Sequence, residues 1–223
     1  MIKGVLFDLD GTLLDRDSSV KKFIHDQYDR LHLHVGHIPK DEYVARFIEL
    51  DQRGYVWKDK VYQQLIKEYG ITGMKWEELL EDYLNDFKFH CVPFPNLTEM
   101  LEQLKNHNLT LGMITNGRGQ FQLDNIKALG IEPYFDRIFI SEWEGMKKPD
   151  PTLFRHALNT LNVQANESVF VGDHPGNDVR AARDVGMRVI WKEDRFWSHA
   201  DADATVNDLS EIPLLIKELI LAQ

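Results

Sequence analysis

Short apolar runs alternate with amphipathic segments along most of the chain. The first run, at 5–10 (VLFDLD), is too densely apolar for a strand with one face in water, so it predicts a strand covered on both faces. Similar runs predict strands at 109–115 (LTLGMIT), 137–141 (RIFIS), 168–173 (SVFVGD), 188–192 (RVIWK) and 204–206 (ATV). Apolar residues at helical spacing predict helices at 98–106, 121–129, 151–161, 178–185 and 212–220. This alternation predicts an α/β fold with a parallel sheet and right-handed crossovers.

Residues 16–91 carry a different pattern. Apolar residues recur there at helical spacing, without a convincing strand, in the segments FIHDQYDRLHL, DEYVARFIELDQRG, WKDKVYQQLIKEYG and WEELLEDYLNDF. Gly54, Gly70 and Gly73 are expected to end helices in this stretch. The pattern predicts a helical domain at 16–91, inserted into an α/β core that is formed by 1–15 and 92–223.

The composition limits the kinds of partner. The chain has 223 residues, of which 43% are hydrophobic, and this is enough for a core domain with a smaller insertion. Lys and Arg number 26 and Asp and Glu number 36, so the formal net charge is −10. We therefore expect no broad attraction to a nucleic acid polymer or to an anionic membrane. An anionic ligand would have to be held by a local site.

The cellular compartment follows from the cysteine content and the N-terminus. Cys91 is the single cysteine, which excludes an internal disulfide framework and predicts a buried thiol in a reducing compartment. The first residues show no basic segment followed by an apolar core and a cleavage site, and no run approaches the roughly 20 apolar residues of a membrane span. These features predict a cytoplasmic protein, and they leave the oligomeric state open.

Polar residues follow most of the predicted strands. Asp8 and Asp10 end the first strand, and Asp173 ends the fourth, with Asp178 five positions later. The other members of this set are Thr115, Asn116 and Gly117 after the second strand, and Lys147, Lys148, Pro149 and Asp150 after the third. The carboxyl ends of parallel strands meet at one edge of the sheet, where α/β proteins place ligands.

Each of these motifs also has an interpretation without chemistry. Asp-Gly and Asn-Gly are common turn dipeptides, and Asp150 before Pro151 is typical of a helix N-cap. Asp178 could likewise cap the helix that follows it. Because four such motifs are expected on one edge, in chain order, we interpret them together as an active site.

The clustered carboxylates indicate a particular chemistry. Asp8, Asp10 and Asp173 would repel one another unless a hard cation neutralised them, and a few oxygen ligands suit Mg²⁺. A carboxylate can then attack phosphorus and form an aspartyl-phosphate. Along an extended strand, Asp8 and Asp10 would lie on the same side, about 6.6 Å apart. One of them could attack while the other handles protons.

The equatorial phosphoryl oxygens would need donors at the same edge. Lys148 and the hydroxyl of Thr115 could stabilise these oxygens, together with backbone N–H groups near Gly11, Asn116 and Gly117.

The ordered set Asp8-Leu9-Asp10-Gly11-Thr12, Thr115, Lys148-Pro149-Asp150 and Gly172-Asp173 with Asp178 resembles the haloacid dehalogenase superfamily of hydrolases. The resemblance covers essentially the whole chain, and the helical insertion resembles the type 1 cap of that superfamily on a Rossmann-like core.

The resemblance implies a role for each matching residue. It implies that Asp8 is the nucleophile and that Asp10 is the general acid and later the base. It implies that Mg²⁺ is bound by the Asp8 carboxylate, the Asp10 backbone carbonyl and Asp173, with Asp178 contributing directly or through water. By the same resemblance, Thr115 and Lys148 hold the phosphoryl group.

The residue at position 10 separates two chemistries within the resembling superfamily. Its true dehalogenases lack an aspartate at this position, because a departing halide needs no proton. An alkoxide leaving group does need one, so Asp10 favours a phosphatase that acts on a small-molecule phosphate ester. A phosphomutase keeps both acids and remains an alternative. The natural substrate, whether a nucleotide, a sugar phosphate or another metabolite, stays open.

Two further classes of protein share parts of the pattern. A signalling receiver module also uses an aspartyl-phosphate, a threonine, a lysine and Mg²⁺ on a parallel sheet. Its phosphorylated aspartate ends a middle strand, whereas Ser141 and Glu142 follow the third strand here, and it needs no helical cap. A phosphate-binding protein without activity would be expected to lose Asp8 or Asp10, and both are present.

Substrate selection is expected to come from the helical insertion. The segment 50–62 (LDQRGYVWKDKVY) places basic and aromatic residues around a glycine, and Arg53 and Lys58 are predicted to bind the substrate. The alternative is a turn between helices. His32, His34 and His37 could bind a transition metal, but the end of a helix explains them better because no cysteine accompanies them.

Overall fold

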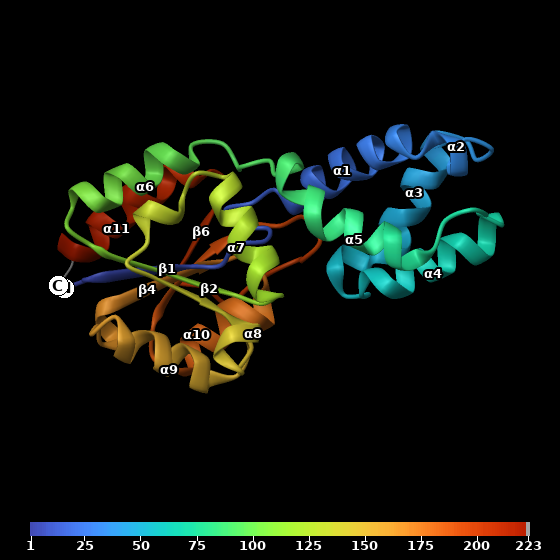
Figure 1. The fold of residues 1–223 in the computed structure, drawn as a ribbon. Coiled ribbons are helices and arrows are strands. Elements are labelled where there is room, and N and C mark those ends of the chain that lie inside the picture. The colour runs from blue at the N-terminus through green and yellow to red at the C-terminus, as the bar shows by residue number, and fades with distance from the viewer. Residues whose placement is uncertain (222–223) are drawn as a thin grey trace. The chain divides into compact units, whose positions relative to one another are not determined.

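The computed structural model describes residues 1–221, with side chains through Leu219. The chain forms two compact units (Figure 1). One unit comprises Met1–Asp15 and the chain from Pro93 onward, and the other is Arg16–Val92. Each unit is described below by itself.

A parallel sheet of six strands forms the centre of the first unit, in the order β3-β2-β1-β4-β5-β6. The strands are β1 (Gly4–Phe7), β2 (Thr110–Thr115), β3 (Arg137–Ile140), β4 (Ser168–Gly172), β5 (Arg188–Lys192) and β6 (Ala204–Val206). All five pairings between neighbouring strands are parallel. The predicted α/β fold with a parallel sheet is confirmed.

Helices cover both faces of this sheet. They are α6 (Leu97–Asn106), α7 (Gly119–Ala128), α8 (Ser141–Glu144), α9 (Pro151–Thr160), a π-helix (Pro175–Arg180), α10 (Ala181–Asp184) and α11 (Ile212–Leu221). Short 3₁₀ turns lie at Glu132–Tyr134, Ala165–Glu167 and Leu209–Glu211. Figure 1 shows α6 and α11 on one face and α9 and α10 on the other. Asp150 is the N-cap residue of α9, as the sequence predicted. Its carboxylate accepts a hydrogen bond from the N–H of Thr152.

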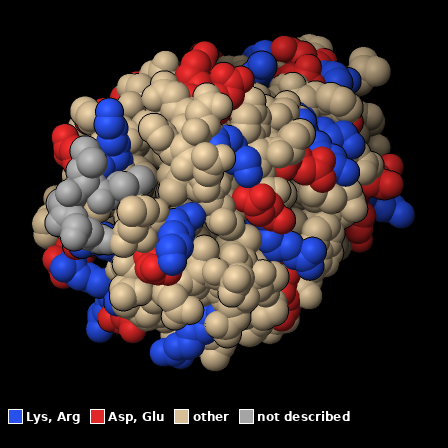
Figure 2. Space-filling model, turned by 90° about the vertical axis from the view of Figure 1, so that its left-hand side faces the viewer, with Lys and Arg blue, Asp and Glu red and all other residues tan. Residues whose placement is uncertain are grey.

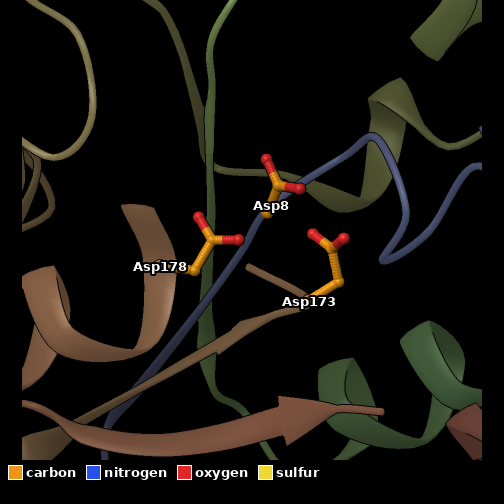
Figure 3. A group of neighbouring side chains, drawn as sticks. All are labelled: Asp8, Asp173 and Asp178. Atoms are coloured by element: carbon orange, nitrogen blue, oxygen red, sulfur yellow. The ribbon is translucent and has the colours of Figure 1, made fainter. Parts of the chain in front are cut away.

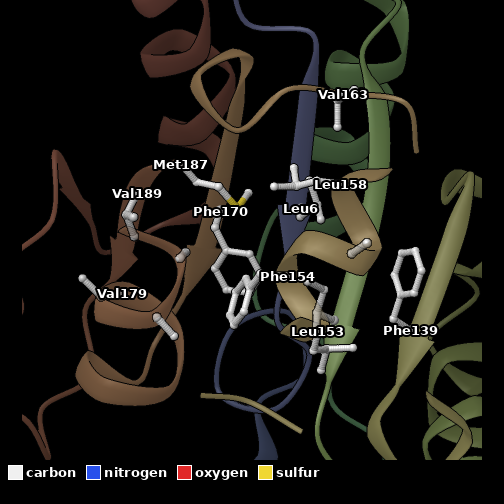
Figure 4. Close-up of a cluster of buried hydrophobic side chains, with 14 of the residues drawn as sticks. Leu6, Phe139, Leu153, Phe154, Leu158, Val163, Phe170, Val179, Met187 and Val189 are labelled. Carbon is white, nitrogen blue, oxygen red and sulfur yellow. The ribbon is translucent and has the colours of Figure 1, made fainter. Parts of the chain in front are cut away.

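The core of the sheet lies under α9 and α10 (Figure 4). Leu6 from β1 and Phe170 from β4 are fully buried there, as the densely apolar strand sequences predict. The rings of Phe154 and Phe170 meet edge to face, with 5.2 Å between their centroids. This packing holds the central strands in place, and the polar residues of the candidate site follow the carboxyl ends of these strands.

The register aligns the ends of the central strands. Phe7, the last residue of β1, pairs with Met113 of β2 and with Val171 of β4. The residues that follow these three positions therefore come out side by side at one edge. The first strand is shorter than predicted, because the chain bends at Leu9. The prediction that an extended strand continues to Asp10 is therefore wrong.

The second unit, residues 16–92, consists of helices joined by loops and contains no strand among its residues, all of which the structure describes. Its elements are α1 (Arg16–Arg30), α2 (His32–Val35), α3 (Lys40–Asp51), a 3₁₀ turn (Gln52–Gly54), α4 (Lys58–Tyr69), α5 (Trp76–Asp86) and a second 3₁₀ turn (Phe87–His90). Buried aromatic rings hold the helices together, with Phe23 packing edge to face against Tyr83 at 5.2 Å. The function of this unit as a cap stays a prediction.

The three clustered histidines lie where α2 meets the neighbouring loops. The ring of His37 is bonded to the carbonyl of Tyr69 at 2.9 Å, and that of His34 to the carbonyl of Thr72 at 3.3 Å. His32 packs its ring against Tyr28. Within residues 1–221, none of the three joins a group of side chains that could hold a metal. The interpretation as the end of a helix is the one that agrees with these contacts.

A buried ion cluster joins α1, α3 and α4 inside the helical unit. The carboxylate of Asp51, which is only 2% exposed, accepts hydrogen bonds from Arg16 (2.8 Å) and from the ammonium of Lys58. Burial by itself would raise the pKa of Asp51, but the charges of Arg16 and Lys58 more than offset burial, and the pKa is lowered from 3.8. Two cations thus share one enclosed carboxylate.

The turn that follows this cluster has an unusual backbone. Gln52, Arg53 and Gly54 all have positive φ, at 46°, 57° and 87°. A Cβ at Gly54 would lie 2.8 Å from the guanidinium of Arg16, so the glycine allows Arg16 to reach Asp51. A left-handed conformation at two consecutive residues other than glycine is sterically costly. The surrounding ion cluster and helices must therefore hold this turn in place.

Candidate active site

Asp8 follows β1 and lies buried at the carboxyl edge of the sheet. One of its carboxylate oxygens is 2.5 Å from the ammonium of Lys148, and the other lies 3.4 Å from the hydroxyl of Thr12. Burial raises the pKa of Asp8 to about 7, although the charge of Lys148 lowers it in part. The negative charges of Asp178 and Asp10 contribute to the increase. Asp8 is therefore a carboxylate whose charge is poorly compensated by the protein alone.

Lys148 connects two carboxylates. Its ammonium donates to Asp8 and, over 2.7 Å, to Asp178, and the side chain is 3% exposed. Burial alone would lower the pKa of Lys148, but the charges of Asp178 and Asp8 outweigh burial and raise it, so the ammonium stays charged.

Asn116 holds the backbone of Lys148. Its side-chain oxygen accepts from the N–H of Lys148, and its side-chain nitrogen donates to the carbonyl of Lys148, both over 2.9 Å. The predicted binding of substrate by the backbone near Asn116 stays a prediction, and the side-chain amide has the additional task of holding the loop that carries the lysine. The turn motif Asn-Gly gives no indication of this long-range contact.

Asp173 and Asp178 complete the acidic edge. Asp173 follows β4, and its backbone carbonyl accepts a hydrogen bond from the indole of Trp191 over 2.7 Å. Asp178 lies on the π-helix, where its carboxylate accepts from the N–H of His174 over 3.0 Å. Burial raises the pKa of Asp173 well above 3.8, and the charges of Asp178 and Asp8 raise it further.

The helix after β4 begins earlier than predicted and has a different cap. The ring nitrogen Nδ1 of His174 accepts from the N–H groups of Gly176 and Asn177, over 2.9 and 3.0 Å. His174 is therefore the N-cap residue, and Asp178 lies inside the helix with its carboxylate near Asp8 and Asp173. The capping interpretation of Asp178 is wrong, because the imidazole already satisfies the orphan N–H groups.

The three carboxylates fit a divalent cation. Asp8, Asp173 and Asp178 each offer an oxygen, and the three oxygens lie within 4.8 Å of one another. Figure 3 shows the three side chains pointing toward one another. The ammonium of Lys148 supplies one positive charge against three negative ones, so the enclosed site has a deficit of positive charge. Hard oxygen donors in this number suit Mg²⁺, which keeps further positions for water or substrate.

Asp10 lies beside this group with a different partner. Its carboxylate accepts from the side-chain amide of Gln122 over 2.7 Å, and the same amide nitrogen lies 2.7 Å from the hydroxyl of Thr115. The carboxylate of Asp10 does not belong to the three that converge within 4.8 Å. The predicted contribution of Asp10 to the metal, through its backbone carbonyl, stays a prediction.

The sequence analysis did not identify Gln122. It predicted a helix at 121–129 without assigning its buried face, and the structure buries Gln122 and Asn125 there beside Ile126. Asn125 and Ile126 lie three and four positions after Gln122, as one face of a helix requires, but two of these three buried positions are polar. The sequence held one signal for this residue. Gln122 is an amide on the inner face of a helix that begins just after the polar end of β2.

Two glycine N–H groups that the sequence assigned to the phosphoryl group have other partners. The N–H of Gly117 donates to the hydroxyl of Ser141 over 2.9 Å, and that of Gly11 donates to the carbonyl of Leu14 over 2.9 Å. Gly11 has φ +86°, and a Cβ there would lie 2.5 Å from the carboxylate of Asp173. This glycine allows the turn after β1 to approach the acidic group.

The two predicted substrate-binding residues of the helical unit have contrasting positions. Lys58, which the sequence placed in a basic and aromatic loop that could bind the substrate, is 5% exposed and is paired with Asp51. Burial in the ion cluster is the reason for this difference. Arg53 is partly exposed, with its guanidinium 3.6 Å from Asp17. The binding roles of both residues stay predictions.

The distribution of charge on the surface agrees with the expectation that an anionic ligand is held by a local site. The face shown in Figure 2 carries Lys and Arg interspersed with Asp and Glu, without a field of one sign. Across residues 1–221, no helix combines the length and the apolar character that crossing a membrane requires.

The sequence and the fold match known hydrolases. A sequence model of the haloacid dehalogenase-like hydrolases matches residues 5–192. The chain is 30% identical to a glyceraldehyde 3-phosphate phosphatase of Pyrococcus abyssi, over 86% of this chain and 81% of that relative. It is 31% identical to a phosphoserine phosphatase of Thermus thermophilus, over 70% of this chain and 64% of the relative.

Solved structures agree with this relationship. The structure of a HAD phosphatase from Thermococcus onnurineus superposes with a TM-score of 0.69 at 29% identity, and the match covers 96% of this chain and 98% of that one. These matches confirm the resemblance that the ordered motifs indicated, and with it the expectation of a hydrolase.

We expect saturating Mg²⁺ to raise the Tm of the protein, and by more at about pH 8 than at about pH 5.5. In the metal-free protein, the pKa of Asp8 is raised from 3.8 to about 7. Its contribution to stability is therefore lost as the pH rises through that range, and below about 7 protons compete with the cation for the carboxylate. Thermal unfolding with Mg²⁺ and with EDTA, at both pH values, measures the shift.

Two variants control this measurement. Asp173→Asn should reduce the increase in Tm, because it removes one of the three converging carboxylates. Asp184→Asn, at an exposed position of α10, should keep the full increase. An equal increase in Asp173→Asn and in the unaltered protein would contradict the assignment of the cation to this site.

Proposed function

Because the chain belongs to the haloacid dehalogenase-like hydrolases, we propose that it is a Mg²⁺-dependent phosphatase that hydrolyses a small-molecule phosphomonoester. The observation that carries the proposal is the buried group of Asp8, Asp173 and Asp178, bridged by Lys148. The proposed reaction proceeds through a phosphorylated Asp8.

The charge balance of the site supports this reaction. Three enclosed carboxylates would repel an incoming phosphate, and a bound Mg²⁺ would supply the positive charge that lets a carboxylate oxygen approach phosphorus. In the proposed first step, an oxygen of Asp8 forms a bond to phosphorus while the bond from phosphorus to the ester oxygen breaks. The ammonium of Lys148 and the hydroxyl of Thr115 stabilise the phosphoryl oxygens.

Asp10 serves the proton transfers in both steps. It donates a proton to the departing ester oxygen, and it then accepts one from the water that attacks the phosphorylated Asp8. The second step releases inorganic phosphate and regenerates the free carboxylate of Asp8. Asp10 is close enough for its charge to raise the pKa of Asp8, which supports a shared reaction site.

The relatives suggest which substrates to test first. Glyceraldehyde 3-phosphate and phosphoserine, named for the two relatives above, are both short phosphate esters of primary alcohols. We propose a substrate of this class, and a cytoplasmic location remains part of the proposal.

We expect Asp8→Asn to slow phosphate release by about 1,000-fold or more, because the amide removes the nucleophilic oxygen and its charge. The measurement is free phosphate from p-nitrophenyl phosphate, glyceraldehyde 3-phosphate and phosphoserine, with Mg²⁺ and with EDTA. Asp184→Asn serves as the exposed control. Normal turnover by Asp8→Asn would contradict the proposed nucleophile.

The same assay separates the proposal from its alternatives. A phosphatase releases many equivalents of phosphate into water for each enzyme molecule. A phosphomutase would instead transfer the group to a sugar hydroxyl, and a receiver module would stop after one stable labelling event. Absence of Mg²⁺-dependent phosphate release from all substrates would overturn the proposal.

We expect Asp10→Asn to affect substrates according to their leaving groups. The value of kcat/KM, which reports the steps through departure of the alcohol, should fall by about 100-fold or more for phosphoserine, which expels an alkoxide, and by much less for p-nitrophenyl phosphate, because nitrophenolate leaves without a proton. Initial rates at saturating Mg²⁺ measure both. Equal losses for the two substrates would indicate that Asp10 does not act as the general acid.

A further inference from the structure

A buried amide connects two residues of the proposed reaction site. Gln122, on α7, is 2% exposed, and its side-chain nitrogen lies 2.7 Å from a carboxylate oxygen of Asp10 and 2.7 Å from the hydroxyl of Thr115. The same nitrogen lies 3.2 Å from the carbonyl of Asn116. These contacts join the loop after β1, the end of β2 and a helix.

The chemistry of the partners fixes the orientation of this amide. An ionised carboxylate and a backbone carbonyl can only accept hydrogen bonds, so the nitrogen of Gln122 must face Asp10 and Asn116. The amide oxygen then faces the side-chain nitrogen of Asn125, at 3.5 Å. A flipped amide would place oxygen against oxygen at the first two contacts.

This orientation determines what Thr115 and Asp10 can still do. The amide nitrogen carries two hydrogens, which point to the two contacts of 2.7 Å, to Asp10 and to the hydroxyl oxygen of Thr115, while the carbonyl of Asn116 at 3.2 Å shares one of them. The hydrogen of the Thr115 hydroxyl therefore remains for a bond to a phosphoryl oxygen. One oxygen of Asp10 is occupied by the same amide. The other oxygen of Asp10 can therefore carry the proton to the leaving group. The amide thus assigns different tasks to the two oxygens of Asp10.

The backbone around Gln122 allows this close approach. Its own N–H bonds to the carbonyl of Arg118 in the first turn of α7, which fixes the start of the side chain. Gly117 has φ +154°, and a Cβ there would lie 2.7 Å from Cγ of Gln122. A larger residue at position 117 would therefore push the amide away from Asp10.

We propose that Gln122 is a positioning residue for the proton-transfer steps, and this inference rests on the proposed phosphatase function. It holds one oxygen of Asp10 and thereby directs the other toward the leaving group. It also makes the hydroxyl of Thr115 a donor to the phosphoryl group. Gln122 itself does not touch the reacting atoms.

Gln122→Met tests this proposal, because it keeps the length of the side chain and removes the hydrogen-bonding amide. We expect kcat/KM for phosphoserine, which reports the step that expels the alcohol, to fall by about 10- to 100-fold, since proton donation depends on alignment, and kcat/KM for p-nitrophenyl phosphate to fall by about threefold or less. A merely structural role would instead lower both rates by the same factor.

Gln120→Met is the matched control. Gln120 lies on the same helix, is exposed, and bonds to Asp124, so the same substitution there should leave both rates within about twofold. Gln122→Ala, which cannot overfill the site, provides a second variant in case the methionine prevents folding. Equal rates in Gln122→Met, Gln122→Ala and Gln120→Met would overturn the proposal.

A double-mutant cycle with Asp10→Asn isolates the coupling. When Asp10 can no longer donate a proton, Gln122→Met should slow phosphoserine hydrolysis by a further threefold at most. If the two losses multiply in full, Gln122 does not act through Asp10. If the unaltered protein releases no phosphate at all, the proposed function fails instead, so the two failures are distinguishable.

Discussion

The deficit of positive charge around Asp8 is the constraint on which the site depends. Asp8, Asp173 and Asp178 converge within 4.8 Å, and Lys148 bridges only two of them. Buried carboxylates are unstable in their charged form without compensation, which is why the pKa values of Asp8 and Asp173 are raised. A site of this kind suits a small divalent cation, whose charge would offset the deficit and whose remaining coordination positions could take oxygens of water or of a ligand.

The rest of the sheet edge keeps these charges together. Small residues allow the close approach, since a Cβ at Gly11 or at Gly172 would collide with the side chain of Asp173 or of Asp178. Hydrogen bonds then hold the loops in place. For example, the side-chain amide of Asn116 bonds to both the N–H and the carbonyl of Lys148. The buried strands below supply the rigid base. Hydrophobic packing thus offsets the electrostatic cost of the cluster.

The helical unit contains a buried cluster in which the positive charges outnumber the negative ones. Around Asp51, two cations share one carboxylate, and the pKa of that carboxylate is lowered instead of raised. Both clusters are buried, so the sign of each shift is decided by the number of neighbouring charges and not by burial alone. The comparison explains why Lys58, which sequence analysis regarded as a surface group, has a structural partner.

The pattern of the sequence by itself predicted the α/β architecture with a parallel sheet, which the structure has. It also placed Asp8, Lys148 and Asp173 after strands of that sheet, and the structure brings their side chains together, while their roles stay predictions. Periodicity and the topology of parallel sheets suffice for these features, because they depend on patterns within short segments. The tertiary structure alone decided the contact of Gln122 with Asp10, the pairing of Asn116 with Lys148 and the burial of Lys58. Each of these is a polar contact between separate segments, and polar side chains carry no periodic signal of their burial.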